Sequence, residues 1–334
     1  MKRKKIDCLC IGSIIADYVL PDNAVQYEGK SPISIAGEGV RVRAGGIAIV
    51  AMGLSRLGLR TALAGMAGND VAGHGLKNFL KVEFGIETEG IQLCGVPTSS
   101  SLVFPTRRER YIRHYIGANA GLDDIAGILA IARRLRPKLA SIGYAGLLPR
   151  LDARGGAGMA DLLKNLRALK VKCCVDAHTL RRGLKVVGHL LPHADIFFCN
   201  MDEGRQISAE KEPFRVLDGL LRKAGTAAED RPRLMGITTA QGVYMAYMAG
   251  RGIQKDFVRS LWHTAKPVDL TGAGDAFRAG VHAHVLAHLR EFEQGVFPWR
   301  SAGMLGNLTA SVMVTKGVTA IQPYKIMLKR SAGS

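Results

Sequence analysis

Asp275 and the loop before it form the stretch of this chain best suited to chemistry. Gly272, Ala273 and Gly274 leave the backbone unobstructed, and an apolar run with helical spacing follows Asp275. Thr271 and Asp275 are both residue types that begin helices. Backbone N–H groups and the helix dipole would then converge on one point, which favours an anion there. An acid at that point suits one task, which is to take a proton from a hydroxyl group that attacks phosphorus. The alternative is an ordinary glycine-rich turn whose aspartate caps a helix.

Other polar residues follow predicted strands. Asp17 comes after a buried run at residues 6–12, and Asn200 and Thr238 come after later apolar runs. Ligands of parallel sheets bind at the carboxyl ends of the strands, so we expect these side chains and Asp275 to face one crevice. Asn200 followed by Glu203 is also the ordinary pattern of a helix cap with an acid in the first turn, which is the alternative for that pair.

The elements that would position these residues alternate between strands and helices from about residue 125 onward. Buried strands are predicted at 139–142, 171–175, 196–199 and 234–238, and helices at 159–169, 180–191, 214–223, 274–289 and 299–315. This alternation predicts a mostly parallel sheet covered by helices on both faces. Exposed strand-like segments at 21–43 and a hairpin within 99–116 predict a second, small sheet.

Composition limits the classes of function. The chain has 334 residues, 47% of them apolar, and a net charge of +18 from 46 basic and 28 acidic residues. The basic residues are scattered and aromatic residues make up only 6%, so neither a nucleic-acid surface nor a base-stacking platform is indicated. No apolar segment is long enough to cross a membrane, and five of the six cysteines lie in apolar runs typical of buried reduced thiols. We expect a soluble cytoplasmic protein that binds neither nucleic acid nor membranes.

Several motifs together resemble the ribokinase/PfkB family of carbohydrate and nucleoside kinases along residues 6–325. Residues 269–280 are similar to that family's C-terminal signature, and residues 44–58, which begin Ala44-Gly45-Gly46, are similar to its N-terminal glycine-rich signature. Weaker matches lie at residues 68–70, 117–119 and 200–203.

This resemblance implies a fold, and the segments of the second sheet suggest an assembly. The resemblance implies one ribokinase-like kinase domain at residues 1–330, with residues 331–334 as a tail. The domain would be an α/β three-layer sandwich with a mostly parallel central sheet, helices on both faces and a small β-sheet lid. The lid segments would lie at about 14–43 and 97–117, and they could also join two copies of the chain as a homodimer.

The resemblance further implies transfer of a phosphoryl group from ATP, with Mg²⁺, to a hydroxymethyl group of a sugar or sugar-like substrate. Asp275 would be the general base, and the N–H groups of Gly272, Ala273 and Gly274 would form the anion hole. The residues implied to contact the acceptor are Asp17, Gly45, Gly46 and Asn119. Those implied on the side of the nucleotide and its cofactors are Asn200, Glu203, Thr238, Gly242, Thr271 and Asn307. Glu203 would serve the magnesium, and Asp269 with Thr271 would serve a monovalent cation such as K⁺.

Two departures from the family pattern leave the acceptor open. Ile49 stands where the N-terminal signature usually has an asparagine that faces the acceptor, and the nucleotide turn at residues 237–242 keeps only its last glycine. The alternatives to a sugar kinase are a nucleoside kinase of the same family and a non-catalytic protein that senses a sugar or a nucleotide. Asp275 and the complete Gly-Ala-Gly loop argue against the sensor, which has no need of a base.

Three histidines follow Asp275 on the same predicted helix. His284 and His288 are four residues apart and could offer two imidazoles to a metal, but neither a carboxylate nor a cysteine beside them completes a set. We therefore predict that these two, with His282, are surface histidines.

Overall fold

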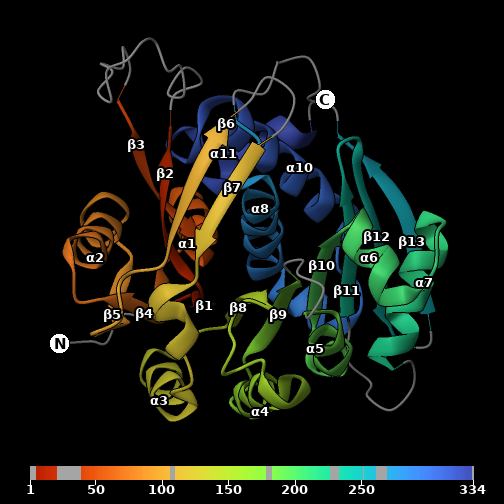
Figure 1. Cartoon of the computed structure of the whole chain (residues 1–334). Helices are drawn as coiled ribbons and strands as arrows, with labels where there is room; N and C mark the ends of the chain where they lie inside the picture. The colour runs from red at the N-terminus through yellow and green to blue at the C-terminus, as the bar shows by residue number, and fades with distance from the viewer. Residues whose placement is uncertain are drawn as a thin grey trace.

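The computed structural model describes residues 5–20, 39–105, 110–177, 183–225, 233–250, 252–260 and 269–332 (Figure 1). Within these ranges the main sheet has nine strands in the order β13-β12-β11-β10-β9-β8-β1-β4-β5. Neighbouring strands pair in parallel from β11 to β5, whereas β12 and β13 form an antiparallel edge. The strands are β1 (Cys8–Gly12), β4 (Thr61–Gly68), β5 (Glu87–Cys94), β8 (Leu139–Ala145), β9 (Lys172–Ala177), β10 (Ile196–Asn200), β11 (Arg233–Thr239), β12 (Gly242–Ala249) and β13 (Gly252–Arg259). The predicted mostly parallel sheet is confirmed.

Helices cover both faces of this sheet, and each face has its own apolar core. One face carries α1 (Ile47–Arg56), α2 (Val71–Phe84), α8 (Ala273–Ala287), α10 (Trp299–Lys316) and α11 (Tyr324–Ala332). The other carries α3 (Ile125–Leu135), α4 (Ala153–Ala168), α5 (Gly183–Leu190), α6 (Met201–Ser208) and α7 (Pro213–Ala224). The strands are apolar on both sides because both sides are covered. The three-layer α/β sandwich is therefore confirmed.

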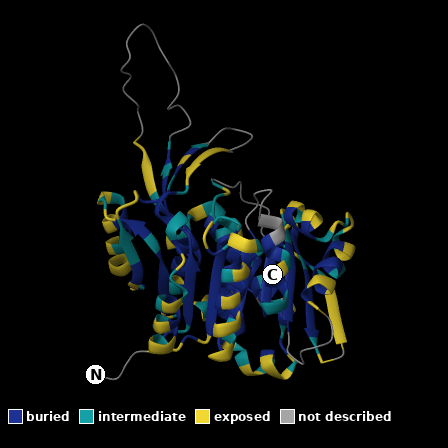
Figure 2. Ribbon diagram, turned by 60° about the horizontal axis from the view of Figure 1, so that its bottom comes forward, coloured by how far each residue is buried: buried dark blue, intermediate teal, exposed yellow. Residues whose placement is uncertain are grey.

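A second sheet stands out from the body of the molecule (Figure 2). It has the order β3-β2-β6-β7, formed by β2 (Ile14–Val19), β3 (Arg41–Gly46), β6 (Ser100–Pro105) and β7 (Arg110–Tyr115). Residues 21–38 and 106–109, which connect these strands, lie outside the described residues. We call this sheet the lid sheet. Strands β2, β6 and β7 lie within the predicted lid segments, whereas β3 extends beyond residue 43 to Gly46. The small second sheet is confirmed.

Asp17 lies inside β2, within the first predicted lid segment, because only Ser13 separates β1 from β2. Helix α11 continues to Ala332 and buries Ser331, so residue 331 belongs to the domain rather than to a tail. Across the ranges the structure describes, none of the helices combines the length and the apolar character that a membrane span requires.

Candidate active site

A cleft of about 510 Å³ lies between the lid sheet and the carboxyl ends of the central strands. The lid sheet contributes Asp17, Ser101 and His114 to its wall. The central sheet and helix α6 contribute Tyr144, Asp176, Asn200, Glu203 and Thr238, and the loop and first turn of α8 contribute residues 270–275. The predicted crevice therefore brings together residues that lie far apart in the sequence.

The anion loop, which we define as Gly272, Ala273 and Gly274, begins helix α8. Gly272 is the residue before the helix and has φ of 78°, a left-handed conformation that favours glycine. A side chain there would also collide with Met313 and Ile49. Open space surrounds Gly274, so a ligand can approach its backbone closely. The loop thus has the geometry of a helix N-terminal anion site.

Asp275 lies in the first turn of α8 with only 6% of its surface exposed. Tyr144 donates its hydroxyl hydrogen to Oδ2 of Asp275 at 2.9 Å, and Arg278 donates from Nη2 to Oδ1. The same Nη2 lies 3.0 Å from Oδ2 of Asp176. Sequence reasoning missed both Tyr144 and Arg278. The one available signal was a charged residue three positions after Asp275 within an apolar run.

Asp17 faces the same cleft from β2 and is 8% exposed. Burial raises its pKa to about 6, with Asp275 adding to that rise and with Ser101 and Arg43 opposing it. Ser101 Oγ also lies 3.1 Å from Nδ1 of His114, so these lid residues form one polar group.

The two glycines predicted to contact the acceptor have different surroundings. A side chain at Gly45 would collide with the carboxylate of Asp17, so Gly45 makes room for that group. Gly46 has φ of 67°, precedes α1 and lines the cleft. A side chain at Gly46 would collide with the carbonyl of Ser13. Both positions therefore require glycine for packing whatever binds beside them.

Asn119 lies away from the cleft wall. Its Oδ1 accepts the N–H of Ile14 at 3.1 Å, and its Nδ2 donates to the carbonyl of Ile14 at 3.1 Å. The side chain is 1% exposed and ties the 3₁₀ turn Gly117–Gly121 to the start of β2. Its amide therefore holds the base of the lid sheet, and this corrects the prediction of a direct acceptor contact.

Asn200 and Glu203 form a capping box at the start of α6. Asn200 Oδ1 accepts the N–H of Glu203 at 2.9 Å, and Glu203 Oε2 accepts the N–H of Asn200 at 2.8 Å. Both residues also line the cleft. The pair therefore caps helix α6, as the alternative interpretation predicted, and it is also part of the site. One carboxylate and one amide oxygen suit Mg²⁺, which keeps several waters and takes further ligands from phosphates.

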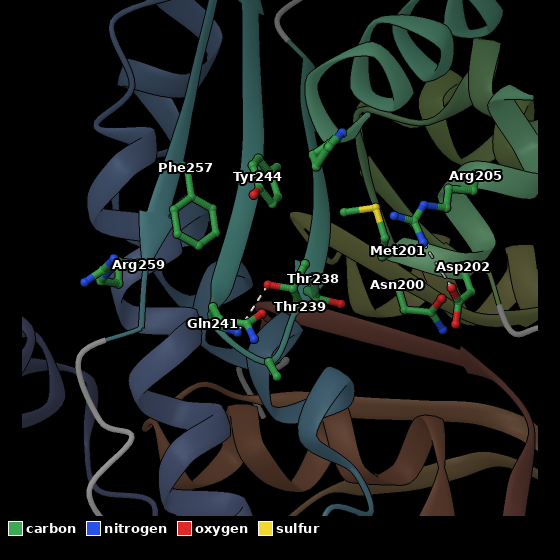
Figure 3. Close-up of a pocket in the computed structure, with 12 residues that line it drawn as sticks. Asn200, Met201, Asp202, Arg205, Thr238, Thr239, Gln241, Tyr244, Phe257 and Arg259 are labelled. Atoms are coloured by element: carbon green, nitrogen blue, oxygen red, sulfur yellow. Dashed lines mark hydrogen bonds and ion pairs between the residues drawn. The ribbon is translucent and has the colours of Figure 1, made fainter. Parts of the chain in front are cut away.

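A second cavity of about 790 Å³ adjoins the first and shares Asn200 and Thr238 with it. Figure 3 shows Thr238, Thr239 and Gln241 on one side and Asn200, Met201 and Arg205 of α6 on the other. Tyr244 and Phe257 lie side by side on β12 and β13 with ring centres 4.5 Å apart. We call this cavity the aromatic groove. The low aromatic content had indicated no such platform. A platform needs only a few rings, however, and here Phe214 packs on Tyr244 from a distant segment of the chain.

Gly242 and Asn307, predicted on the nucleotide side, lie outside the walls of both cavities. A side chain at Gly242 would collide with the carbonyl of Val258, and Asn307 donates to that same carbonyl at 3.1 Å. Both residues therefore hold β13 in place. Their predicted contact with a nucleotide stays a prediction.

Asp269 is already engaged within the protein. Its Oδ2 pairs with Nη1 of Arg43 at 2.5 Å, and its Oδ1 accepts the N–H of Thr271 at 2.8 Å. Burial opposes ionisation there, but the hydrogen bonds from Thr271 and Arg43 outweigh it and lower the pKa of Asp269. Because a guanidinium occupies the carboxylate, this donor set does not fit a monovalent cation. In the part of the chain that the structure describes, no group of three or more His, Cys, Asp or Glu side chains could hold a metal by itself.

Comparisons with known proteins bear on the whole chain. The family model described as pfkB family carbohydrate kinase matches residues 5–325. The bifunctional protein HldE of Nitrobacter hamburgensis is 24% identical over 325 residues, which cover 94% of this chain and 61% of that protein. The 2-dehydro-3-deoxygluconokinase of Bacillus subtilis is 23% identical over 296 residues, which cover 84% of each. The structure of Arabidopsis thaliana ribokinase complexed with ribose and ATP superimposes with a TM-score of 0.74 at 18% identity, and covers 99% of this chain and 100% of that one. The chain thus spans about 61% of the length of the first relative, and most of the length of the other two.

Proposed function

Because the chain belongs to the pfkB family of carbohydrate kinases, which are phosphotransferases with alcohol acceptors, we propose that it transfers the γ-phosphoryl group of ATP to a hydroxymethyl group of a sugar or sugar-like acceptor. Asp275 would be the general base. One observation carries this proposal. The anion loop, Asp275 and the acidic lid residue Asp17 line a single cleft, although they come from opposite ends of the chain.

The proposed reaction needs few covalent steps. The acceptor hydroxyl gives its proton to Asp275, its oxygen bonds to the γ-phosphorus, and the bond from that phosphorus to the β–γ bridging oxygen breaks to release ADP. A positioned base contributes about 10²–10⁴-fold to such a step. The N–H groups of Gly272, Ala273 and Gly274 would stabilise the charge that develops on the phosphoryl oxygens.

Magnesium and the nucleotide would be held on the α6 side. Asn200 and Glu203 would hold Mg²⁺ through its water shell, and the ion would neutralise phosphate charge. The aromatic groove would take the rest of the nucleotide, because Tyr244 and Phe257 offer faces on which a base can stack and Thr238 joins the groove to the cleft. No step is assigned to a monovalent cation, because Arg43 occupies Asp269.

The acceptor end of the cleft has a polar part and a larger apolar part. Asp17, Ser101 and His114 can bond hydroxyl groups, whereas Ile15, Ile49, Val103, Ile112 and Leu147 offer only carbon. The apolar part favours a second candidate, a nucleoside, whose base would pack there while its sugar meets Asp17. At position 49 the acceptor would meet the apolar side chain of Ile49 instead of a side-chain amide.

We also propose that two copies of the chain pair through the lid sheet. Residues alternate across a strand, so the side chains next to the cleft-facing ones point to the outer face. That outer face carries Val42, Leu102, Tyr111 and Tyr115, which are 44–60% exposed. An unpartnered sheet face is normally polar. A second copy presenting the same face would bury these side chains.

The function is tested by measuring ADP release with a coupled assay across three panels: sugars, deoxy-keto acids and nucleosides. We expect release that depends on both Mg²⁺ and one class of acceptor, with the phosphorylated product identified by mass spectrometry. Release with nucleosides alone would select the second candidate. If no panel gives release above the acceptor-free rate, the chain is a binding protein that kept the fold, and the proposal fails.

A further inference from the structure

Arg278 is a charged side chain buried at the floor of the cleft. It lies one helical turn after Asp275 on α8 and is 2% exposed. Its Nη2 contacts both Oδ1 of Asp275 and Oδ2 of Asp176. Taking a guanidinium out of water is costly unless carboxylates compensate it. An apolar residue would fit the surrounding run of α8 better, so this arginine needs a reason beyond packing.

The contacts of Arg278 bear on how readily Asp275 can accept a proton. The positive charge on Oδ1 and the Tyr144 hydroxyl on Oδ2 fix the orientation of the Asp275 carboxylate. The attraction between this positive charge and the ionised carboxylate is lost when the carboxylate takes a proton. A carboxylate paired with arginine alone would be a poor proton acceptor, because accepting the proton would leave the buried guanidinium without a counter-charge.

Asp176 removes that difficulty. It reaches the same nitrogen from β9 with a side chain 14% exposed. With two carboxylates on one guanidinium, the group has a net charge of −1 before proton transfer and 0 afterwards. Arg278 thus stays paired with Asp176 at the moment Asp275 becomes neutral. The second carboxylate therefore keeps the guanidinium compensated after the proton transfer.

We propose that Arg278 and Asp176 act as paired positioning residues for Asp275, in which Arg278 orients the base and keeps it ionised while Asp176 preserves its capacity to accept a proton. This inference rests on the proposed function. It assigns a role to Arg278 and Asp176, for which the resemblance implied none. It also explains why a buried arginine stands in the first turns of α8.

The charged and titratable groups around Asp275 come from five elements. Tyr144 belongs to β8, Cys174 and Asp176 to β9, Glu203 to α6, Asp17 to β2, and Arg278 and His282 to α8. His282 stays neutral because burial, together with Arg278, lowers its pKa to about 3. Burial raises the pKa of Asp176 well above its usual range, with Asp275 and Glu203 adding to that rise and Arg278 opposing it.

The test compares the two variants that remove opposite charges. Arg278→Met removes the cation, so the acid limb of the kcat–pH profile should move to higher pH. Asp176→Asn removes an anion of nearly the same shape, so the limb should move to lower pH. Each shift should be at least about one pH unit, a tenfold change in proton affinity. The double variant should return toward the native profile. Profiles are taken at saturating acceptor, since titration of Asp17 then affects KM rather than kcat.

The matched control is Arg300→Met, which breaks an exposed arginine–aspartate pair with Asp256 and should leave the limb in place. Should Arg278→Met not fold, Arg278→Gln and Asp176→Asn still give the two directions. The titration of Asp275 is also followed by carbon NMR of labelled aspartate in the protein without substrates. This titration tests the coupling of Asp275 to Arg278 and Asp176 even if no acceptor panel gives ADP release. A failure of the coupling is therefore distinguishable from a failure of the proposed function. The proposal would be overturned if the acid limb of the kcat–pH profile stayed in place in both variants, or if it moved in the same direction in both.

Discussion

At the scale of single residues, Asp17 and Asp275 share one cleft but are held differently. Two donors fix Asp275, whereas Asp17 is buried in the lid sheet with Ser101 and Arg43 as the groups that favour its charge. Burial wins at Asp17 and raises its pKa to about 6. The two carboxylates are therefore suited to different tasks, one to proton transfer and the other to binding hydroxyl groups.

The raised pKa of Asp17 predicts how acceptor affinity depends on pH. A protonated Asp17 loses the charge that strengthens hydrogen bonds from the acceptor. The apparent KM for the acceptor should therefore rise as pH falls from about 7 to about 5. Asp17→Asn should raise this KM at least about tenfold at neutral pH and remove its dependence on pH, because a hydrogen bond to a charged group contributes about 1.5–3 kcal/mol. Initial-rate measurements across that pH range check both outcomes, and a pH-independent native KM would remove Asp17 from the acceptor site.

Part of the site could be predicted from the sequence because it is local. A few consecutive residues are enough to identify the anion loop with Asp275, and the same is true of the capping pair Asn200 and Glu203. Tyr144 and Arg278 could not be placed, because their role depends on β8 and α8 meeting across more than 130 positions. The acceptor contact expected of Asn119 failed for the same reason, since a long-range backbone partner uses its amide.

At the scale of elements, helix α8 carries more polar groups into the core than its pattern indicates. The expectation that His282 and His284 lie on the surface is wrong, because they are 0% and 2% exposed. His282 bonds Ser141 of β8 at 3.0 Å, and His284 bonds the hydroxyl of Tyr324 on α11 at 3.0 Å. Spacing identifies which residues share a face of a helix. It does not reveal that α8 is covered on all sides, by the sheet on one side and by α10 and α11 on the other.

These buried histidines predict acid sensitivity. Burial lowers the pKa of His282 to about 3 and that of His284 to about 4, below the value near 6.5 in the unfolded chain. Between these values the unfolded state binds more protons than the folded state. The free energy of unfolding should therefore fall as pH falls below about 6.5, by about 1.4 kcal/mol per pH unit for each histidine.

Urea unfolding at several pH values measures this slope. His282→Gln, which keeps a group able to bond Ser141, should make the decline shallower. The matched control is His74→Gln, which alters an exposed histidine bonded to Asn69 and should leave the slope unchanged. Equal slopes for the native chain and His282→Gln would contradict the assignment of a neutral buried imidazole.

At the scale of the whole molecule, the alternation of strands and helices was enough to predict the layered body, because a parallel sheet with crossovers has few ways to cover both faces. The lid sheet followed from exposed strand-like segments. Its strand order was not predictable, since β2 pairs β6 in parallel across some 80 intervening positions.

The lid sheet gives the prediction that concerns assembly. If two copies bury Leu102 and Tyr111 against each other, light scattering should give twice the mass of one chain at micromolar concentration. Leu102→Glu and Tyr111→Glu should each shift the mass to that of one chain, because an unpaired charge would be buried at the interface. Val71→Glu, an exposed apolar site outside the lid sheet, is the matched control. A native protein that stays at the mass of one chain at every concentration would rule out this pairing.

The central claim is that Asp275 takes the proton of the acceptor, and its most direct test is the turnover of Asp275→Asn. The carboxamide oxygen can still accept from Tyr144 or Arg278, so the fold and ATP binding measured by calorimetry should be retained. Without the base, kcat should fall by about 10²–10⁴-fold, whereas Asp161→Asn on the exposed face of α4 should keep native turnover. Turnover of Asp275→Asn above about a tenth of the native value would contradict the assignment of the general base.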